Sequence, residues 1–122
     1  MTAATKQFVA RHRFARLAAR KARLAADQIR GLDVNKAIET LEFNPRRSAS
    51  FLLKVLKSAV ANASQDETIN INRLYVSDSR ADDGPLHMRR LRWRPGPQGR
   101  AMPFRKRTSH LTVIVREREE AE

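Results

Sequence analysis

The chain has 122 residues, 41% of them hydrophobic, which is enough for one domain with a modest core. Lys and Arg total 25 against 13 Asp and Glu, and the resulting net charge of +12 predicts a polyanionic partner, because such a chain repels itself. With no Cys it has no disulfides or Cys-based zinc sites, and no apolar run approaches the roughly 18 residues of a membrane-spanning helix, so we expect a cytoplasmic protein without a membrane partner.

The first expected helix spans residues 14–30. Ala22, Ala25 and Ile29 fall on one side of a 3.6-residue helix, which predicts an apolar face, and Gly31 supplies a C-terminal cap. The opposite side is a basic stripe, formed by Arg16, Arg20, Arg23 and Arg30.

This basic stripe has two interpretations. A solvated surface is the usual role of helical Arg, but Asp27 is the only acidic interruption, so the stripe lacks the countercharges that a solvated helix carries. Arg11, His12 and Arg13 extend the same positive surface. The pattern therefore favours a nucleic-acid contact.

Two further helices are expected. One spans residues 35–41 after the capping residue Asn35, and the next begins at Asn44 and Pro45, which suit the first positions of a helix. The longer of the two has a continuous apolar face, made of Ala49, Leu52, Leu53, Leu56, Ala59, Val60 and Ala63.

Two strands are expected in the second half, at 69–78 and 111–115, where apolar and polar residues alternate. They should pair, with the three helices on one face. Between them, Asp82-Asp83-Gly84-Pro85 has the composition of a turn that redirects the chain.

The segment 86–107 fits no core. It holds eight Arg or Lys and no acidic residue, with a Pro/Gly cluster at 95–99 that predicts the turn of a β-hairpin. Such a ribbon is only marginally stable by itself in water. Its arms of about ten residues reach on the order of 30 Å, so we expect it to project beyond the globular part. Arg suits phosphate because its planar fork pairs two oxygens, so the ribbon is predicted to bind RNA.

Trp93 lies within this ribbon and has two possible roles. It can stack on an unpaired base, or it can pack across the ribbon with Leu91 and the opposite arm. Both remain open from the sequence.

A nuclease could be imagined from Asp82, Asp83 and His110, with His12 and His87 elsewhere in the chain. The histidines show no metal-ligand spacing, and no nucleotide-binding loop or nucleophile motif occurs. We assign no catalytic residue, no metal and no cofactor. A non-specific basic DNA-binding or nucleoid protein is the alternative function.

Five short segments in order resemble the bacterial large-subunit ribosomal protein family L twenty-two. They are 21–31 (Lys-Ala-Arg-Leu, Ala-Asp and Ile-Arg-Gly), 58–63 (Ser-Ala and Ala-Asn-Ala), 82–85, 99–101 (Gly-Arg-Ala) and 106–110 (Lys-Arg-Thr-Ser-His). The resemblance covers roughly residues 8–116.

The resemblance implies an α+β fold with three helices packed on a small antiparallel three-stranded sheet and a long protruding β-hairpin. It places a third strand near 8–11. The chain would form a single domain, 1–122, whose globular part is about 8–85 and 107–116 and whose hairpin is about 86–106. An acidic tail, 117–122, would follow.

In function, the resemblance implies a structural component of the large ribosomal subunit that binds its RNA, supports assembly and lines the nascent-peptide exit tunnel. The partners would be large-subunit ribosomal RNA, neighbouring ribosomal proteins and the nascent polypeptide, with the chain a monomer within the ribosome. The tunnel-lining tip would be Trp93, Arg94, Pro95, Gly96, Pro97 and Gln98. The expected RNA-binding residues are Arg11, Arg13, Arg16, Arg20, Lys21, Arg23, Arg47, Lys54, Arg89, Arg90, Arg92, Arg94, Arg100, Arg105, Lys106, Arg107, Ser109 and His110.

The chain departs from this family at the tip. Residues 94–98, Arg-Pro-Gly-Pro-Gln, replace the usual Pro-Arg-Ala-x stretch, and the segment between Pro85 and Gly99 is a few residues longer than expected.

Overall fold

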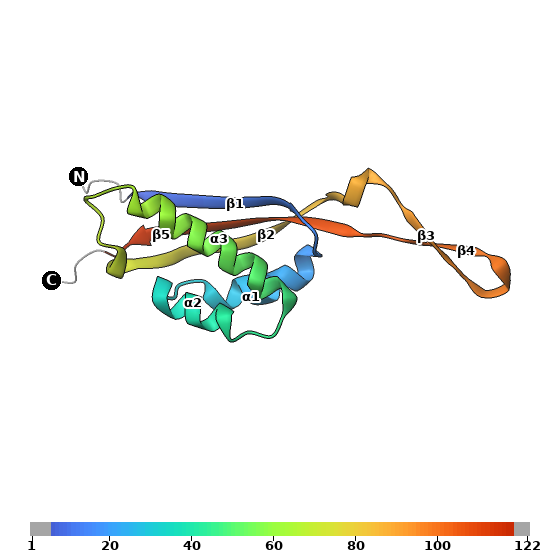
Figure 1. Ribbon diagram of the computed structural model, residues 1–122, viewed down its shortest axis with the longest axis horizontal. Coiled ribbons are helices and arrows are strands. Elements are labelled where there is room, and N and C mark those ends of the chain that lie inside the picture. The colour runs from blue at the N-terminus through green and yellow to red at the C-terminus, as the bar shows by residue number, and fades with distance from the viewer. Residues whose placement is uncertain (1–5, 119–122) are drawn as a thin grey trace.

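The computed structural model describes residues 6–118 and has an α+β architecture (Figure 1). The central antiparallel sheet has the order β1-β5-β2, and a second, two-stranded sheet pairs β3 with β4. The strands are β1 (Gln7–Ala15), β2 (Leu74–Leu86), β3 (Arg92–Pro95), β4 (Ala101–Phe104) and β5 (Arg107–Glu117). The helices are α1 (Ala19–Ile29), α2 (Val34–Glu42) and α3 (Arg47–Ser64).

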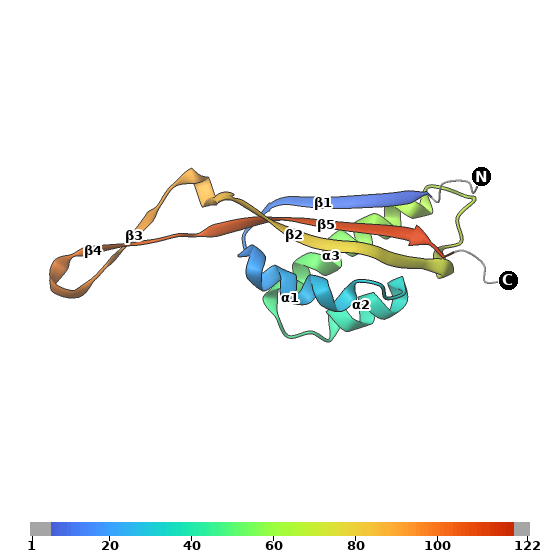
Figure 2. The same cartoon turned by 180° about the vertical axis from the view of Figure 1, so that it is seen from behind.

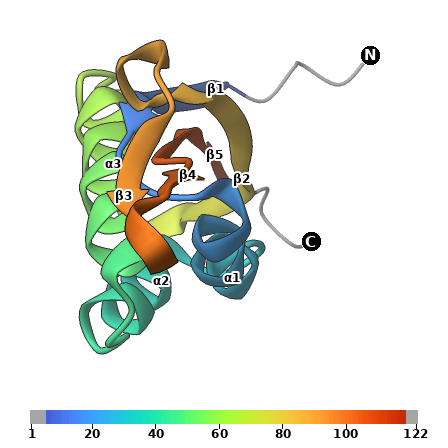
Figure 3. The same cartoon turned by 90° about the vertical axis from the view of Figure 1, so that its right-hand side faces the viewer.

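The molecule is elongated because β3 and β4 extend beyond the globular part, away from the start of β1 and the end of β5 (Figures 1 and 2). Viewed from the hairpin end, the three helices lie on one side of the sheet, with α3 beside β1 and α1 nearer β2 (Figure 3). These features confirm the expected fold class: three helices on a three-stranded antiparallel sheet with a protruding hairpin.

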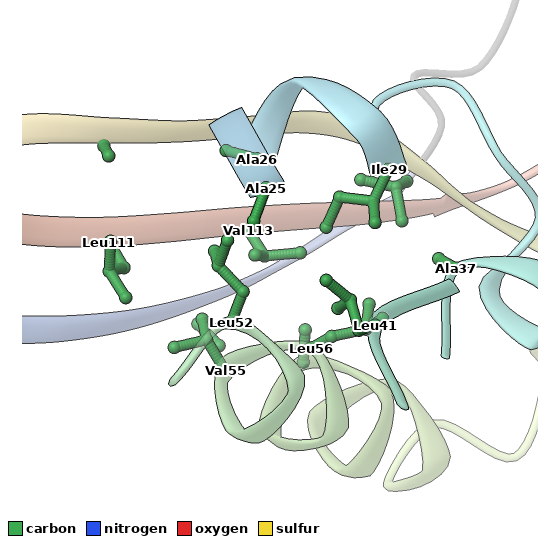
Figure 4. Close-up of a cluster of buried hydrophobic side chains, with 14 of the residues drawn as sticks. Ala25, Ala26, Ile29, Ala37, Leu41, Leu52, Val55, Leu56, Leu111 and Val113 are labelled. Atoms are coloured by element: carbon green, nitrogen blue, oxygen red, sulfur yellow. The ribbon is translucent and has the colours of Figure 1, made fainter. Parts of the chain in front are cut away.

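The core lies between the helices and the sheet. Leu111 and Val113 of β5 are fully buried beneath Leu52 and Leu56 of α3 and the small residues of α1 (Figure 4). Alanines such as Ala25 let the α1 backbone approach the sheet closely, while the leucines fill the remaining space. The helical periodicity therefore identified the buried faces correctly.

The start of the first helix was predicted wrongly. Residues 14–18 are not helical, because β1 continues to Ala15, which pairs with Ser109 of β5. Phe14 has φ 59°, and the strand register shifts there before the chain turns into α1. The strand implied at 8–11 is real but longer, since sheet pairing overrides helical propensity in this segment. Gly31 follows α1 with φ 86°, but its N–H donates to the Val76 carbonyl of β2 (2.9 Å) instead of a helix carbonyl, so the predicted cap is a turn onto the sheet.

The other helices deviate less from expectation. Helix α3 begins at Arg47, because Asn44 Oδ1 accepts a hydrogen bond from the Arg46 backbone N–H (2.9 Å) and holds a turn before the helix. Helix α2 runs from Val34 to Glu42 and includes all of the expected 35–41.

Two predictions about β2 were wrong. Residues 71–73 form a 3-10 helix, so the strand begins at Leu74 rather than near residue 69. The segment 82–85 is not a turn, because β2 continues through it to Leu86, which pairs with Arg107. The lack of space for a side chain explains Gly84 here, because a Cβ on it would lie 2.7 Å from Thr108 Oγ1 and 3.3 Å from the His110 ring.

The hairpin turn was predicted correctly at the Pro/Gly cluster, where residues 97–99 close the loop between β3 and β4. A Cβ on Gly96 would lie 2.6 Å from Met102 Cγ and 2.9 Å from the Arg100 carbonyl oxygen, so any other residue there would force the two arms apart.

The two arms of the hairpin have unequal lengths. Leu86 pairs with Arg107 and Arg92 with Phe104, so residues 87–91 on one arm face only 105–106 on the other. The surplus forms a bulge at the 3-10 helix 87–89, visible beside β2 in Figure 1. This bulge accommodates extra length between Pro85 and Gly99.

The predicted start of the acidic tail, at residue 117, was wrong. Glu117 ends β5, and the Arg118 guanidinium donates from Nε to Asp33 Oδ1 (2.7 Å) and from Nη2 to the Gly31 carbonyl (3.2 Å). These two residues belong to the globular part. Residues 119–122 lie outside the described residues.

Candidate nucleic-acid interface

A basic groove of about 740 Å³ lies at the root of the hairpin. We call it the root groove. Of its lining residues seven are cationic and none is acidic, and the complete lining is Arg16, Leu17, Ala18, Lys21, Leu24, Arg46, Arg47, Ser48, Arg105, Lys106 and Arg107.

Three distant segments build this groove. Residues 16–24, which lead into α1 and form its start, make one wall, and residues 46–48 at the start of α3 make a second. The two are held together where Ser48 Oγ donates to the Lys21 carbonyl (3.4 Å). The start of β5 and the two residues before it form the third, and the His87 backbone N–H fixes that segment by donating to the Lys106 carbonyl (2.8 Å). The fold thus gathers positive charge that is scattered in the sequence.

No cation of the root groove forms an ion pair with a carboxylate within residues 6–118. Like charges on three walls repel one another, so the groove raises the energy of the free chain and attracts polyanions. Arg47 also lies over the Phe51 ring (5.6 Å), which stacks on His12 (5.9 Å) and orders this wall.

The basic stripe on α1 divides into two parts. Arg23 Nε donates to the Ala81 carbonyl (3.0 Å). Arg30 pairs with Asp78 (3.7 Å) and donates to the Ser79 carbonyl, so both arginines help to fix α1 on β2. Arg20 and Lys21 are exposed and form no ion pair in the described chain. Arg23 and Arg30 therefore serve the fold, whereas Arg16 and Lys21 line the root groove.

The hairpin has no buried side chain in β3 or β4. Arg94 lies over the Phe104 ring (4.2 Å), and Trp93 pairs in register with Pro103 but stays 62% exposed. Cross-strand packing therefore covers only a minor part of the indole. Arg89, Arg90 and Arg100 are exposed along the same ribbon.

His87 sits where the hairpin leaves the globular part. Its Nδ1 contacts the Arg92 guanidinium. Partial burial of the imidazole, together with the positive charges of Arg16, Arg92 and Lys106, holds the pKa of His87 below its ordinary value of 6.5. The local field is therefore positive enough to oppose a further proton.

A second basic hollow, of about 380 Å³, lies on the sheet face that the helices leave open. His110 is oriented there, because the Phe14 backbone N–H donates to its Nδ1 (3.1 Å) and the two rings meet edge to face (4.9 Å). The lining of this hollow is Arg11, Arg13, Phe14, Arg80, Asp82, His110 and Thr112.

One expected RNA-binding residue is placed wrongly for that role. Ser109 is fully buried on the helix-facing side of β5, so its side chain is removed from the proposed contacts. The other expected residues are accessible, including Lys54 on α3. Arg46 and Arg80 were missed, although Arg46 stands beside Arg47 directly after Pro45, a spacing that places both at a helix start.

The geometry gives no support to a nuclease. Asp82 and Asp83 are neighbours in a strand and so point to opposite faces, Asp82 into the open-face hollow and Asp83 toward Arg23 (4.0 Å). Between Lys6 and Arg118, no three His, Asp or Glu side chains lie close enough to hold a metal ion. Over the same stretch, no helix has the length and apolar character needed to cross a membrane.

The family model described as ribosomal protein L22p/L17e matches residues 10–116. The match includes all three helices, the hairpin and nearly all of the central sheet. An acid-free basic groove and an acid-free basic ribbon on one small domain are the features that a partner of folded RNA needs. The chain therefore belongs to the ribosomal protein L22p/L17e family, whose members are structural rather than enzymatic, and it is a large-subunit ribosomal protein that binds ribosomal RNA.

Proposed function

We propose that this protein supports assembly of the large subunit and lines the nascent-peptide exit tunnel with its hairpin. The single observation that carries the proposal is the division of the molecule. A self-sufficient core bears the root groove, and a ribbon without buried side chains extends away from it. The core is suited to dock on RNA at the subunit surface, and the ribbon to follow RNA inward.

The ribbon gains its order from this environment. Two-stranded hairpins are marginal in water, and repeated positive charge destabilises them further. Ribosomal RNA on both sides would neutralise the arginines, while residues 93–98 at the tip would face neighbouring ribosomal proteins and the nascent polypeptide. The chain would act there as a cytoplasmic, ribosome-bound monomer.

The test uses a shortened hairpin. Replacing residues 88–105 with Asn-Gly joins the paired residues His87 and Lys106 by a two-residue turn and leaves the core sheet intact. The variant should still co-sediment with large subunits at moderate salt, and it should alter nascent-chain stalling or sensitivity to tunnel-binding antibiotics.

A full-length chain with Lys57→Gln is the matched control, because it changes an exposed residue of α3 and leaves the hairpin intact. Unchanged stalling and antibiotic sensitivity in the shortened variant would refute the tunnel role. Crosslinking in cells addresses the alternative function: predominant recovery of genomic DNA instead of ribosomal RNA would favour a DNA-binding protein.

A further inference from the structure

We infer that the root groove is a site for a single-stranded segment of RNA, such as a loop or bulge, and not for a duplex. The inference rests on the proposed function and specifies the kind of RNA structure that the core recognises. It is carried by the placement of the cations, by the apolar floor between them and by the size of the groove.

The cations surround the groove. Arg16 and Lys21 belong to the α1 wall, Arg46 and Arg47 to the α3 wall, and residues 105–107 to the hairpin root. A duplex presents its phosphates on a broad convex surface and can be met from one side. Charges on three walls instead suit a backbone that enters the groove and exposes its phosphates in several directions.

The groove also has an apolar part between its charged walls. Leu17, Ala18 and Leu24 contribute to the lining, and Leu24 is 47% exposed. An unstacked base or ribose can cover this surface while its phosphates meet the arginines. A paired base in a duplex cannot, because its faces are occupied by its neighbours.

The size of the groove agrees with this occupant. Its 740 Å³ lies within the range of pockets that enclose a drug-sized ligand, so it can take in a nucleotide or two of a single strand but not a whole duplex. The first turns of α1 and α3 add to the attraction, since neither helix has a side-chain cap on its N-terminal N–H groups.

The test compares two probes on the full-length chain: a single-stranded oligouridylate of on the order of 12 nucleotides, within the usual site size, and a duplex of the same length. Binding is followed by fluorescence anisotropy over a range of salt concentrations. We expect tighter binding of the single strand at every salt concentration.

The groove variant is Arg46→Gln with Arg107→Gln, and the matched control is Lys36→Gln with Lys57→Gln, two exposed lysines outside the groove. Because each lost phosphate contact lowers the salt slope for single strands by about 0.7, the groove variant should lower it by about 1.4. The control should leave the slope unchanged. Circular dichroism verifies that each variant is folded.

Three outcomes would overturn the inference: equal binding of duplex and single strand, equal effects of the groove and control variants, or stronger competition by an oligoglutamate peptide of matched charge, which would indicate an acidic protein partner. If any of these occurs while the chain still co-sediments with large subunits, the groove assignment alone fails. Absence from large subunits would instead refute the proposed function.

Discussion

The core and the hairpin of this protein obey opposite physical rules. In the core, strands are flanked by buried Leu, Val and Ala, and no charged residue is among the buried residues of the described chain. In the hairpin, β3 and β4 bury no side chain, and Trp93, Met102 and Leu91 are exposed among arginines that form no ion pair with a carboxylate within residues 6–118. The comparison teaches that the core carries its own stability, whereas the hairpin depends on what surrounds it.

The largest contrast should appear when one leucine is truncated in each region. Leu52→Ala removes a fully buried side chain beneath β5 and should lower the free energy of unfolding by about 2–5 kcal/mol. Leu91→Ala in the hairpin, where the side chain is 41% exposed, should change it by less than about 0.5 kcal/mol. Urea denaturation followed by circular dichroism measures both, and equal losses would show that the hairpin is part of the cooperative unit.

A smaller effect is expected at Gly84, at the border between the two regions. Gly84→Ala places a Cβ against Thr108, whose Oγ1 donates to the Pro85 carbonyl, and should cost about 1–3 kcal/mol. The same change in a Thr108→Ala background should cost less, because the clashing oxygen is gone. Equal costs in the two backgrounds would show that the close contact does not explain the glycine.

A change in protonation is expected at the hairpin root. Phosphates bound in the root groove would offset the charges of Arg16, Arg92 and Lys106, so the pKa of His87 should rise when RNA binds. Reciprocally, RNA binding should tighten as the pH falls through the interval between the two pKa values. NMR titration of the His87 ring measures the pKa. Arg16→Gln is the control, and in the free chain it should raise this pKa.

The smallest effect concerns the end of the core farthest from the hairpin. Lys6 Nζ contacts Asp66 Oδ2 at 2.6 Å, and this bond, with help from Thr68, lowers the pKa of Asp66 from 3.8 to about 2. The lowered pKa stabilises the folded chain above pH 3.8, and this contribution is lost as the pH falls through about 2. The free energies of unfolding of Asp66→Asn and of the unmodified chain, measured by urea denaturation, should therefore differ above pH 4 and converge near pH 2. A difference that stays constant with pH would contradict this role of Asp66.

The sequence was sufficient wherever a local pattern decided the structure. The buried faces of α1 and α3 followed from helical periodicity, and the hairpin turn from its Pro/Gly cluster. The predictions from the sequence were wrong where pairing with a distant strand determines the structure. Phe14 and Ala15 were predicted to be helical but belong to a strand, and 82–85 was predicted to be a turn but is part of β2, with an irregularity in its pairing to β5 between Asp83 and Leu86.

The candidate interface shows the same limit. The density of arginine predicted a basic ribbon, but no sequence pattern could show that Arg46 would stand opposite Arg107, since 61 positions separate them along the chain. Nor could it show that Ser109 faces the core while His110, the next residue, faces outward, because this depends on strand register.

The position of β5 has a mechanical consequence. This strand follows β4, the second arm of the hairpin, and lies at the centre of the sheet, bonded to β1 on one side and β2 on the other. A force that pulls the tip along the strand axis is therefore resisted by both neighbouring strands in shear, with many hydrogen bonds loaded together. If a polypeptide pulled on the tip, the hairpin would transmit that force to β5, which is held by hydrogen bonds to a strand on each side.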